Sequence, residues 1–290
     1  MNVIDCKQTR TLMLCEARNR LEKMSEPLKL VIIQVGDNDA SNTYIRNKKK
    51  TAGEVGIEVQ HIRCSYHVAK EEIKQLILEY NNRPDVTGIM LQLPLPAHWS
   101  DSVQELLDTI VWYKDVDGLS SESLGRLWTG RECITPATPT GIMRLLPKDL
   151  SGYRCTIVNR SNLIGKPLAK MLLDRDATVT VCHSKTQGLA TACAEADIVI
   201  TGTGKAKMFD SFKSSIVQSQ VWIDCGINRD ENGKLCGDID EASFRSHSKL
   251  YTAHTITTVP GGVGVLTTAQ LMLNVIQAHE IQKRIFNIEV

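Results

Sequence analysis

A tyrosine and a lysine that could transfer protons stand four residues apart, at Tyr44 and Lys48. On a helix this spacing puts both side chains on one face. A lysine held in a partly dry environment is less stable as a cation, so its pKa falls and it can move protons near neutral pH. On spacing alone, a solvated face of a surface helix is the more common arrangement, and Lys49 and Lys50 follow directly.

Two further polar groups could serve the same chemistry. Gln92 ends an otherwise apolar run, so its amide must bond a ligand, Lys48 or a structural partner. The loop from Lys114 to Gly118 carries two carboxylates, Asp115 and Asp117. One carboxylate could accept two parallel hydrogen bonds from a heterocycle, or the loop could be a simple Asx-type turn.

The segment from Asn159 to Pro167 follows an apolar run and opens a helical pattern, as dinucleotide-binding loops do. Gly165 would allow close packing of helix on strand, and the helix N-terminus would attract phosphate, although the full G-x-G-x-x-G pattern is absent. The next apolar run ends at Cys182 without a following acid that would repel a 2′-phosphate. With Arg160 and Ser184 near, this favours NADP over NAD.

A glycine-rich segment, Pro260 to Gly264, has three glycines in four positions. Such a run indicates special backbone geometry or the close approach of a ligand, or alternatively a hinge between domains.

The elements that must position these residues alternate between strand and helix patterns, which predicts an α/β fold with parallel sheets covered by helices. Helices are expected over residues 40–55, 70–80, 141–146, 165–173 and 267–284, with Thr138 as the cap of the third. Strands are expected over residues 28–35, 59–64, 87–93, 155–158, 178–182, 197–201 and 221–225.

Length and charge narrow the class of protein. The chain has 290 residues, which favours two domains, and its formal net charge is +1, which argues against a role resting on bulk charge at nucleic acid or membrane. No apolar run is long enough to cross a bilayer, and the N-terminus does not read as a signal peptide. The nine cysteines lack metal-site spacing, so we expect free thiols, no metal and a cytoplasmic protein.

Taken together, the motifs resemble the bifunctional methylenetetrahydrofolate dehydrogenase/methenyltetrahydrofolate cyclohydrolase (FolD) family, over nearly the whole chain. The matching blocks occur in the family's order: residues 35–48 with Tyr44 and Lys48, 92–96, 114–118, 160–162, 183–186 and 260–264. Tyr-x-x-x-Lys also occurs in short-chain dehydrogenases, but there the cofactor fingerprint precedes the pair.

The resemblance implies an oxidoreductase and hydrolase of one-carbon folate metabolism, serving purine biosynthesis. In the reaction that the resemblance implies, 5,10-methylenetetrahydrofolate is oxidised with NADP, and water then opens the methenyl cation to 10-formyltetrahydrofolate. The resemblance makes Lys48 the general acid/base of hydrolysis and Gln92 the group that orients it. It makes Tyr44 a folate-packing residue and Asp117 the ligand of the pterin edge. Implied folate contacts are Tyr44, Gln92, Leu93, Pro94, Asp117, Pro260, Gly261 and Gly262.

The resemblance also implies the cofactor contacts, the domains and the assembly. Expected cofactor contacts are Asn159, Arg160, Ser161, Ile164, Gly165, His183, Ser184, Lys185, Thr201, Gly202, Gly204 and Ile227. A folate-binding catalytic domain would comprise residues 1–140 with the C-terminal helix, about 267–290, packed back on it. A Rossmann-type NAD(P)-binding domain would comprise 141–266, with the active-site cleft at the junction and homodimerisation through the cofactor domains.

The sequence departs from the family at several positions near the cofactor. Asn159 stands where the family usually has glycine, Ala137 replaces a cysteine, and Val265 and Leu266 replace Pro-Met. Asn159 tolerates a left-handed backbone, but its side chain takes space near the phosphates. Open alternatives are a relative with only dehydrogenase activity, one that is mainly a cyclohydrolase, and a catalytically silent folate-binding protein.

Overall fold

The computed structural model describes residues 1–210, 220–250 and 254–286, which form two compact units. The first unit contains Met1–Arg10 and Thr138–Thr267, and the second contains Thr11–Ala137 and Thr268–Val290. Both are built on parallel sheets with helices, so the predicted α/β fold class is confirmed. The first ten residues differ from expectation: they join the first unit because β1 (Asn2–Val3) pairs with β11 (Thr255–Ile256).

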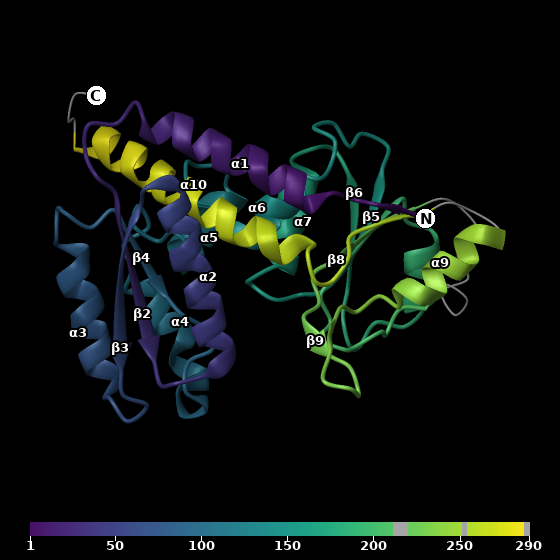
Figure 1. The fold of residues 1–290 in the computed structure, drawn as a ribbon, viewed down its shortest axis with the longest axis horizontal. Coiled ribbons are helices and arrows are strands. Elements are labelled where there is room, and N and C mark those ends of the chain that lie inside the picture. Colours follow the sequence, from purple (N-terminus) through teal and green to yellow (C-terminus); the bar gives the residue numbers. More distant parts are fainter. Residues whose placement is uncertain (211–219, 251–253, 287–290) are drawn as a thin grey trace. The chain divides into compact units, whose positions relative to one another are not determined.

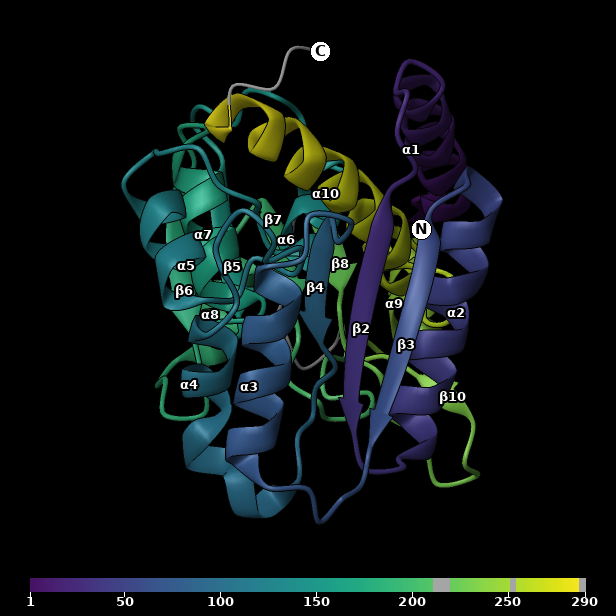
Figure 2. The same ribbon diagram turned by 90° about the vertical axis from the view of Figure 1, so that its left-hand side faces the viewer.

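The second unit holds a three-stranded parallel sheet in the order β3-β2-β4. The strands are β2 (Lys29–Val35), β3 (Glu58–Cys64) and β4 (Gly88–Leu91), connected through α2 (Asp39–Val55) and α3 (Lys70–Asn81). These elements match the predicted ones to within a few residues at each end. Figure 2 shows α2 and α3 on opposite sides of this sheet, the arrangement that right-handed crossovers on either side produce.

The two faces of this sheet differ in character. Val31 and Ile33 of β2 belong to an apolar core with Ile73 and Ile77 of α3, to which α4 (Val103–Asp108) also contributes. Successive residues of a strand point to opposite faces. The alternate positions of β2 and β4 therefore face α2. Two buried polar side chains lie on this face: Gln34 of β2 and Gln92, which directly follows β4.

Two long helices also contribute to the second unit, and α5 (Ser121–Trp128) adds a short one. The last helix, α10, runs over Val263–Ile285, and it begins four residues earlier than predicted. Its Asn274 donates to the carbonyls of Val116 and Thr135 at 2.9 Å each. The sequence analysis did not predict α1 (Cys6–Leu21), whose buried stripe is narrow and whose remaining surface is largely polar.

The first unit is built on a six-stranded sheet in the order β1-β11-β8-β7-β5-β6, in which every pair is parallel (Figure 1). The four central predicted strands are confirmed as β5 (Arg154–Val158), β6 (Thr178–Cys182), β7 (Ile198–Thr201) and β8 (Val221–Asp224). From β5 the chain passes to β6 on one side of it, then returns to β7 on the other side and continues to β8. The strand order therefore reverses between β5 and β7, where open α/β sheets bind ligands.

Helices cover both faces of this sheet. One core joins α7 (Gly165–Leu173) to Ile157 and Ile200, and the other joins Val199 and Trp222 to α8 (Leu189–Ala194) and α9 (Glu241–Leu250). A short hairpin, β9 (Asn228–Arg229) with β10 (Leu235–Cys236), follows β8.

The predicted helix at 141–146 is misplaced: α6 covers Ala137–Met143. Thr138 therefore lies inside its first turn instead of capping it, and its hydroxyl bonds that of Thr267 at 3.1 Å. Proline is compatible with a first helical turn, so Pro139 does not force the helix to begin after it.

The loop from Lys114 to Ser120 is held in place by a buried carboxylate. Asp115 pairs with Ile89 of β4 and accepts hydrogen bonds from the amides of Gly118, at 3.0 Å, and Ser120, at 2.8 Å. Gly118 has φ +65°, and a Cβ there would lie 2.6 Å from the carbonyl oxygen of Ile134. The turn that places Asp117 therefore requires glycine.

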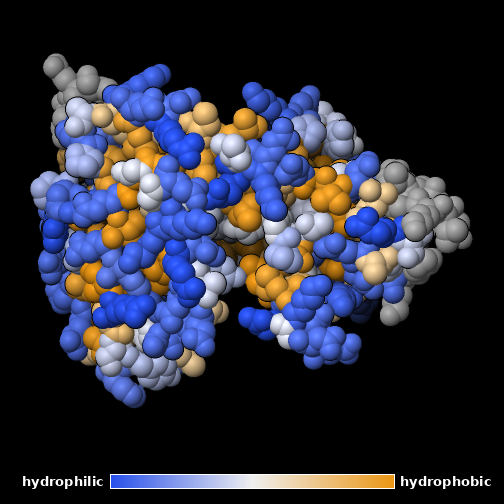
Figure 3. Space-filling view, viewed as in Figure 1, coloured by the Kyte–Doolittle hydropathy of each residue, from blue (hydrophilic) through white to orange (hydrophobic). Residues whose placement is uncertain are grey.

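Within the described residues, no helix is both long and apolar enough to cross a membrane. On the face shown in Figure 3, hydrophilic side chains predominate and hydrophobic ones gather in small patches between them.

We expect Gly118→Ala to lower the free energy of unfolding by about 2 kcal/mol or more, because alanine is strained at this φ and its methyl group meets backbone. Urea unfolding followed by circular dichroism measures the loss. Gly125→Ala is the matched control, because Gly125 lies in α5 with nothing within 4 Å of its missing Cβ, so alanine there should be neutral or stabilising. Equal effects of the two substitutions would contradict the analysis of the turn.

Candidate active site and cofactor loops

Lys48 lies on the buried side of α2, in the second unit. The helix is capped by Asn38, whose side chain accepts from the amide of Ser41 at 3.1 Å. Lys48 is 9 % exposed, whereas its neighbours Lys49 and Lys50 are exposed. The solvated-face interpretation therefore applies to those two lysines and not to Lys48.

The ammonium group of Lys48 is bonded to the adjacent strand. Its Nζ donates to Oε1 of Gln92 at 3.0 Å and lies 3.3 Å from Sδ of Met90. Met90 and Gln92 are two residues apart at the end of β4, so they share the face turned toward α2. Gln92 is itself buried, and its Nε2 donates to the carbonyl of Leu93 at 2.5 Å. The structure therefore brings Lys48 and Gln92 together, as the sequence analysis proposed.

This environment lowers the pKa of Lys48. Burial, which removes water from the ammonium group, is the main cause, and the negative charge of Asp117 partly opposes it. Both contacts of Nζ are with neutral groups, so neither replaces the lost hydration with a full countercharge. Lys48 is therefore poised to exchange a proton at a lower pH than an ordinary lysine.

Tyr44 lies one helical turn before Lys48 and is 38 % exposed. Burial of part of its ring raises the pKa of the phenol, so Tyr44 stays protonated near neutral pH. An exposed, protonated phenol with an apolar ring suits packing against a flat ligand better than proton abstraction.

The two aspartates of the 114–118 loop have different roles. The Asp115 carboxylate is fully buried and accepts from Gly118, Ser120 and Ser123, so it is the structural acid of the turn. Asp117 accepts no hydrogen bond from another described residue. Burial raises its pKa and the charge of Lys48 lowers it. Asp117 is therefore the carboxylate of this loop that remains available to a ligand.

The sequence analysis missed a polar network that fixes the start of α2. Gln34 of β2 is buried; its Nε2 donates to Asn42 at 2.9 Å, and its Oε1 lies 2.8 Å from Nε2 of His61. Asn42 in turn donates to Asp37 at 2.7 Å. A lone glutamine in an otherwise apolar strand was the available signal, as it was for Gln92.

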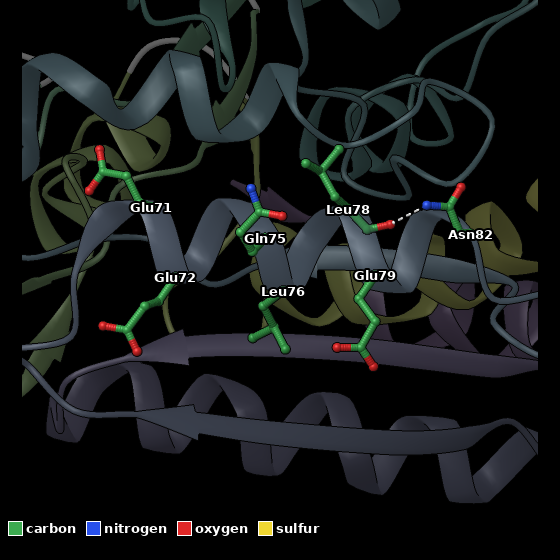
Figure 4. A pocket seen from close by; sticks show the side chains of 7 residues that line it. All are labelled: Glu71, Glu72, Gln75, Leu76, Leu78, Glu79 and Asn82. Carbon is green, nitrogen blue, oxygen red and sulfur yellow. Dashed lines mark hydrogen bonds between the residues drawn. The ribbon is translucent and has the colours of Figure 1, made fainter.

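A shallow hollow on the outer surface of α3 is a separate feature (Figure 4). Its lining side chains are Glu71, Glu72, Gln75, Leu76, Leu78, Glu79 and Asn82, and none is a candidate site residue. Glu72 accepts from the amide of Ala69 at the start of the helix, and Asn82 donates to the carbonyl of Leu78 at its end. Glu72 and Asn82 therefore bond the two ends of the helix itself.

In the first unit, the loops after β5, β6, β7 and β8 carry the predicted cofactor residues. Asn159, Arg160 and Ser161 follow β5, and Ile164 and Gly165 begin α7. A Cβ on Gly165 would lie 2.0 Å from the carbonyl oxygen of Asn159, so glycine permits the close approach that the sequence indicated.

The loop after β6 exposes hydrogen-bond donors and no acid. His183 is partly buried, with its Nδ1 accepting from the amide of Lys185 at 3.1 Å, while Ser184 and Lys185 are exposed. Arg160, after β5, is exposed as well, and β5 and β6 are neighbouring strands. Parallel strands bring these loops to the same edge of the sheet, and their donors fit a phosphorylated ligand there.

The loops after β7 and β8 are held by two buried acids that the sequence analysis missed. Asp238 accepts from the amide of Thr203 at 2.5 Å, and Asp224 accepts from that of Gly226 at 2.8 Å. Burial raises the pKa of Asp224 to about 6, and the amides that it accepts from oppose this shift. These acids position the loops with Gly202, Gly204 and Ile227; Thr201 itself is buried in β7.

Pro260, Gly261 and Gly262 belong to the first unit, whereas Tyr44, Lys48, Gln92 and Asp117 belong to the second. Gly261 has φ +96°, so the special backbone geometry expected of this segment is present. The folate contacts assigned to these three residues stay predictions. Within the described residues, no group of histidine, cysteine or acidic side chains could hold a metal ion.

Known families account for both units. Residues 4–117 match the catalytic domain of tetrahydrofolate dehydrogenase/cyclohydrolase, and residues 136–283 match its NAD(P)-binding domain. The bifunctional protein FolD of Streptococcus thermophilus is 42% identical over 252 residues, 86% of each chain. That of Lactococcus lactis is 38% identical over 284 residues, 96% of this chain and 97% of its own.

Solved structures agree with these matches. The bifunctional FolD enzyme of Campylobacter jejuni superposes with a TM-score of 0.89 at 36% identity, covering 97% of this chain and 99% of its own. The Trypanosoma brucei enzyme, complexed with NADP cofactor and inhibitor, gives 0.83 at 27% identity over 96% of both chains. The buried lysine bonded to a glutamine and the loops with exposed donors at the sheet edge thus occur in a chain that belongs to the tetrahydrofolate dehydrogenase/cyclohydrolase family.

Proposed function

We propose that this protein oxidises 5,10-methylenetetrahydrofolate with NADP and hydrolyses the resulting methenyl cation to 10-formyltetrahydrofolate. The observation that carries the proposal is Lys48, a buried amine with a lowered pKa held by Gln92 in a chain of this family. A folate-binding protein without catalysis would have no use for such a lysine, since burying an unpaired ammonium is unfavourable.

In the hydrolytic step, neutral Lys48 accepts a proton from the water that attacks the methenyl carbon. The hydroxyl of this adduct then loses its proton to solvent and becomes the formyl oxygen, while the bond from the carbon to N5 breaks. N5 takes up the proton held by Lys48, which leaves the formyl group on N10 and the amine neutral again. A neutral lysine suits this task because the substrate is itself a cation, and a second positive charge beside it would be repelled. Gln92 orients the amine through the bond at 3.0 Å.

Folate recognition is assigned to the residues around this lysine. Asp117 accepts two hydrogen bonds from the pterin edge, because it is the loop's available carboxylate. The exposed ring of Tyr44 packs on the ligand. The remaining contacts assigned in the second unit are Gln92, Leu93 and Pro94. In this proposal Pro260, Gly261 and Gly262 of the first unit also contact the folate.

The cofactor residues of the first unit fit a nicotinamide dinucleotide. Arg160 and Ser184 would hold the 2′-phosphate, and the loop after β6 carries no acid to repel it. Ser161, Lys185, Gly202, Gly204 and Ile227 would line the same edge of the sheet. The chemistry that NADP supplies, when bound, is acceptance of the hydride.

We also propose a cytoplasmic homodimer that serves purine biosynthesis. β6 is the edge strand of the first unit's sheet, and its Val181 is 39 % exposed. Edge strands offer unpaired backbone groups to a second chain, which supports association through this unit.

Lys48→Ala should lower the cyclohydrolase kcat about 10²–10⁴-fold while folate still binds, because the variant removes the positioned base. Stopped assays of methenyltetrahydrofolate hydrolysis measure the rate, and equilibrium binding of the folate provides the second readout. Lys49→Ala is the matched control, since its side chain is exposed on the same helix. Near-normal hydrolysis by the Lys48 variant would end the proposed role. Hydrolysis absent from the wild type, with oxidation retained, would indicate a dehydrogenase only.

The cyclohydrolase rate should rise with pH through the lowered pKa of Lys48, because only the neutral amine accepts a proton. Raising the pH deprotonates the amine, so the ascending limb should lie below the ordinary lysine value of 10.5. The profile of kcat against pH, corrected for uncatalysed hydrolysis, measures this. A limb at the ordinary lysine value would show that Lys48 is not desolvated in the working enzyme.

NADP should be used in preference to NAD, and Arg160→Ala should lower kcat/KM for NADP about 10-fold or more while changing that for NAD little, because charge-assisted bonds to the 2′-phosphate are lost. Initial rates with each cofactor test this. Arg154→Ala is the control, because Arg154 lies at the other end of β5 beside Asp197. A preference of the wild type for NAD would refute the assignment of Arg160 and Ser184.

A further inference from the structure

The side chain of Asn159 bridges the point where the strand order of the first unit reverses. Asn159 directly follows β5, and Gly202 directly follows the neighbouring strand β7. The Asn159 Nδ2 donates to the carbonyl of Gly202 at 2.6 Å. In open α/β sheets, this carboxyl edge at the reversal is where a dinucleotide lies.

The other end of the amide bonds the start of α7. The Asn159 Oδ1 accepts from the amide of Ser161 at 2.8 Å, from its hydroxyl at 2.7 Å, and from the amide of Gly165 at 3.1 Å. Gly165 is the first residue of α7, so its N–H is one of those that a helix leaves for a ligand or a cap.

The neighbouring N–H groups are also satisfied by the chain. The amide of Ile164 donates to the Ser161 hydroxyl at 3.1 Å, and that of Lys166 donates to the Ser161 carbonyl at 3.1 Å. Pro167 has no N–H to offer. The donors that would bind a phosphate at a helix N-terminus are therefore bonded to Asn159 and Ser161 instead.

Backbone geometry does not explain why asparagine stands here. Among the described residues, the non-glycine positions with positive φ are Asp176 and Lys207, so Asn159 is not in the left-handed region that the sequence analysis considered. A residue with any L side chain can adopt this backbone. The distinctive property of Asn159 is thus its side-chain amide, which bonds the loops that follow two strands and the start of α7.

We propose that the Oδ1 of Asn159 occupies the anion position at the start of α7 and so lowers the affinity of this site for a dinucleotide's pyrophosphate. A carbonyl oxygen there disfavours the pyrophosphate that NADP and NAD share, and leaves the 2′-phosphate contacts at Arg160 and Ser184 unaffected. Because both cofactors carry this group, the amide lowers both affinities by the same factor, and the preference for NADP depends on the 2′-phosphate contacts alone. This inference rests on the proposed use of a nicotinamide dinucleotide.

Asn159→Ala tests the inference by calorimetric binding of NADP, NAD and inorganic pyrophosphate, together with thermal unfolding of the free protein. Removing the side-chain amide of Asn159 should tighten binding of all three probes about 10-fold. The backbone N–H groups that it releases can then donate to a charged phosphate, and such hydrogen bonds are strong. The same variant should lower the unfolding temperature, because four side-chain hydrogen bonds are lost. A purely structural residue would instead weaken both stability and binding.

Asn162→Ala is the matched control, because this exposed asparagine of the same loop accepts from the side chain of Lys166. It should change neither binding nor unfolding temperature. Asn159→Gly, which also removes the side-chain amide, is the second variant if the alanine protein is poorly folded.

Unchanged or weaker binding of NADP and pyrophosphate by folded Asn159 variants would overturn the inference. Failure of the wild type to bind NADP would instead count against the proposed oxidation, and the pyrophosphate measurements would still decide whether Asn159 occupies an anion position.

Discussion

The burial of one ammonium group constrains the second unit more than any other interaction. A charge removed from water costs several kcal/mol unless hydrogen bonds or countercharges replace the lost hydration. Lys48 receives one amide oxygen, a thioether sulfur and the field of Asp117. This incomplete compensation is what lowers its pKa, so the same feature that is unfavourable for folding makes the lysine useful for proton transfer.

Holding that lysine requires two elements in register. α2 must present Lys48 inward, and the Gln34 network with its bond to Asn42 fixes the start of this helix. β4 must present Gln92 on the matching face, and the strand is bordered by the Asp115 turn through Ile89. A shift of one residue in β4 would turn Gln92 to the opposite, apolar face.

In the first unit, the loops at the carboxyl edge of the sheet are fixed by a different kind of interaction. Buried acids, Asp224 and Asp238, fix the loops after β7 and β8 through backbone amides. Asn159 does the same for the loop after β5, but with a side chain placed at the edge itself. Rigid loops reduce the ordering cost of binding.

Periodicity and punctuation in the sequence were sufficient to predict the α/β class and the central strands, because a buried parallel strand is a short apolar run whatever it packs against. They also predicted the helices α2, α3, α7 and α10. The order of the motifs was sufficient to identify the family. Helices α1, α4, α5, α8 and α9 were missed and the start of α6 was misplaced, because a narrow apolar stripe, a short helix and a proline in a first turn are weak local signals.

What only the tertiary structure decided is how each polar residue is used. Lys48 and Lys49 are alike in the sequence, and burial alone distinguishes them. The carboxylate of Asp115 accepts hydrogen bonds within the turn, whereas that of Asp117 does not. The hydrogen bonds of Asn159 join residues up to 43 positions apart. Local sequence determines which groups are present, but desolvation and long-range hydrogen bonds, which depend on packing, determine what those groups can do.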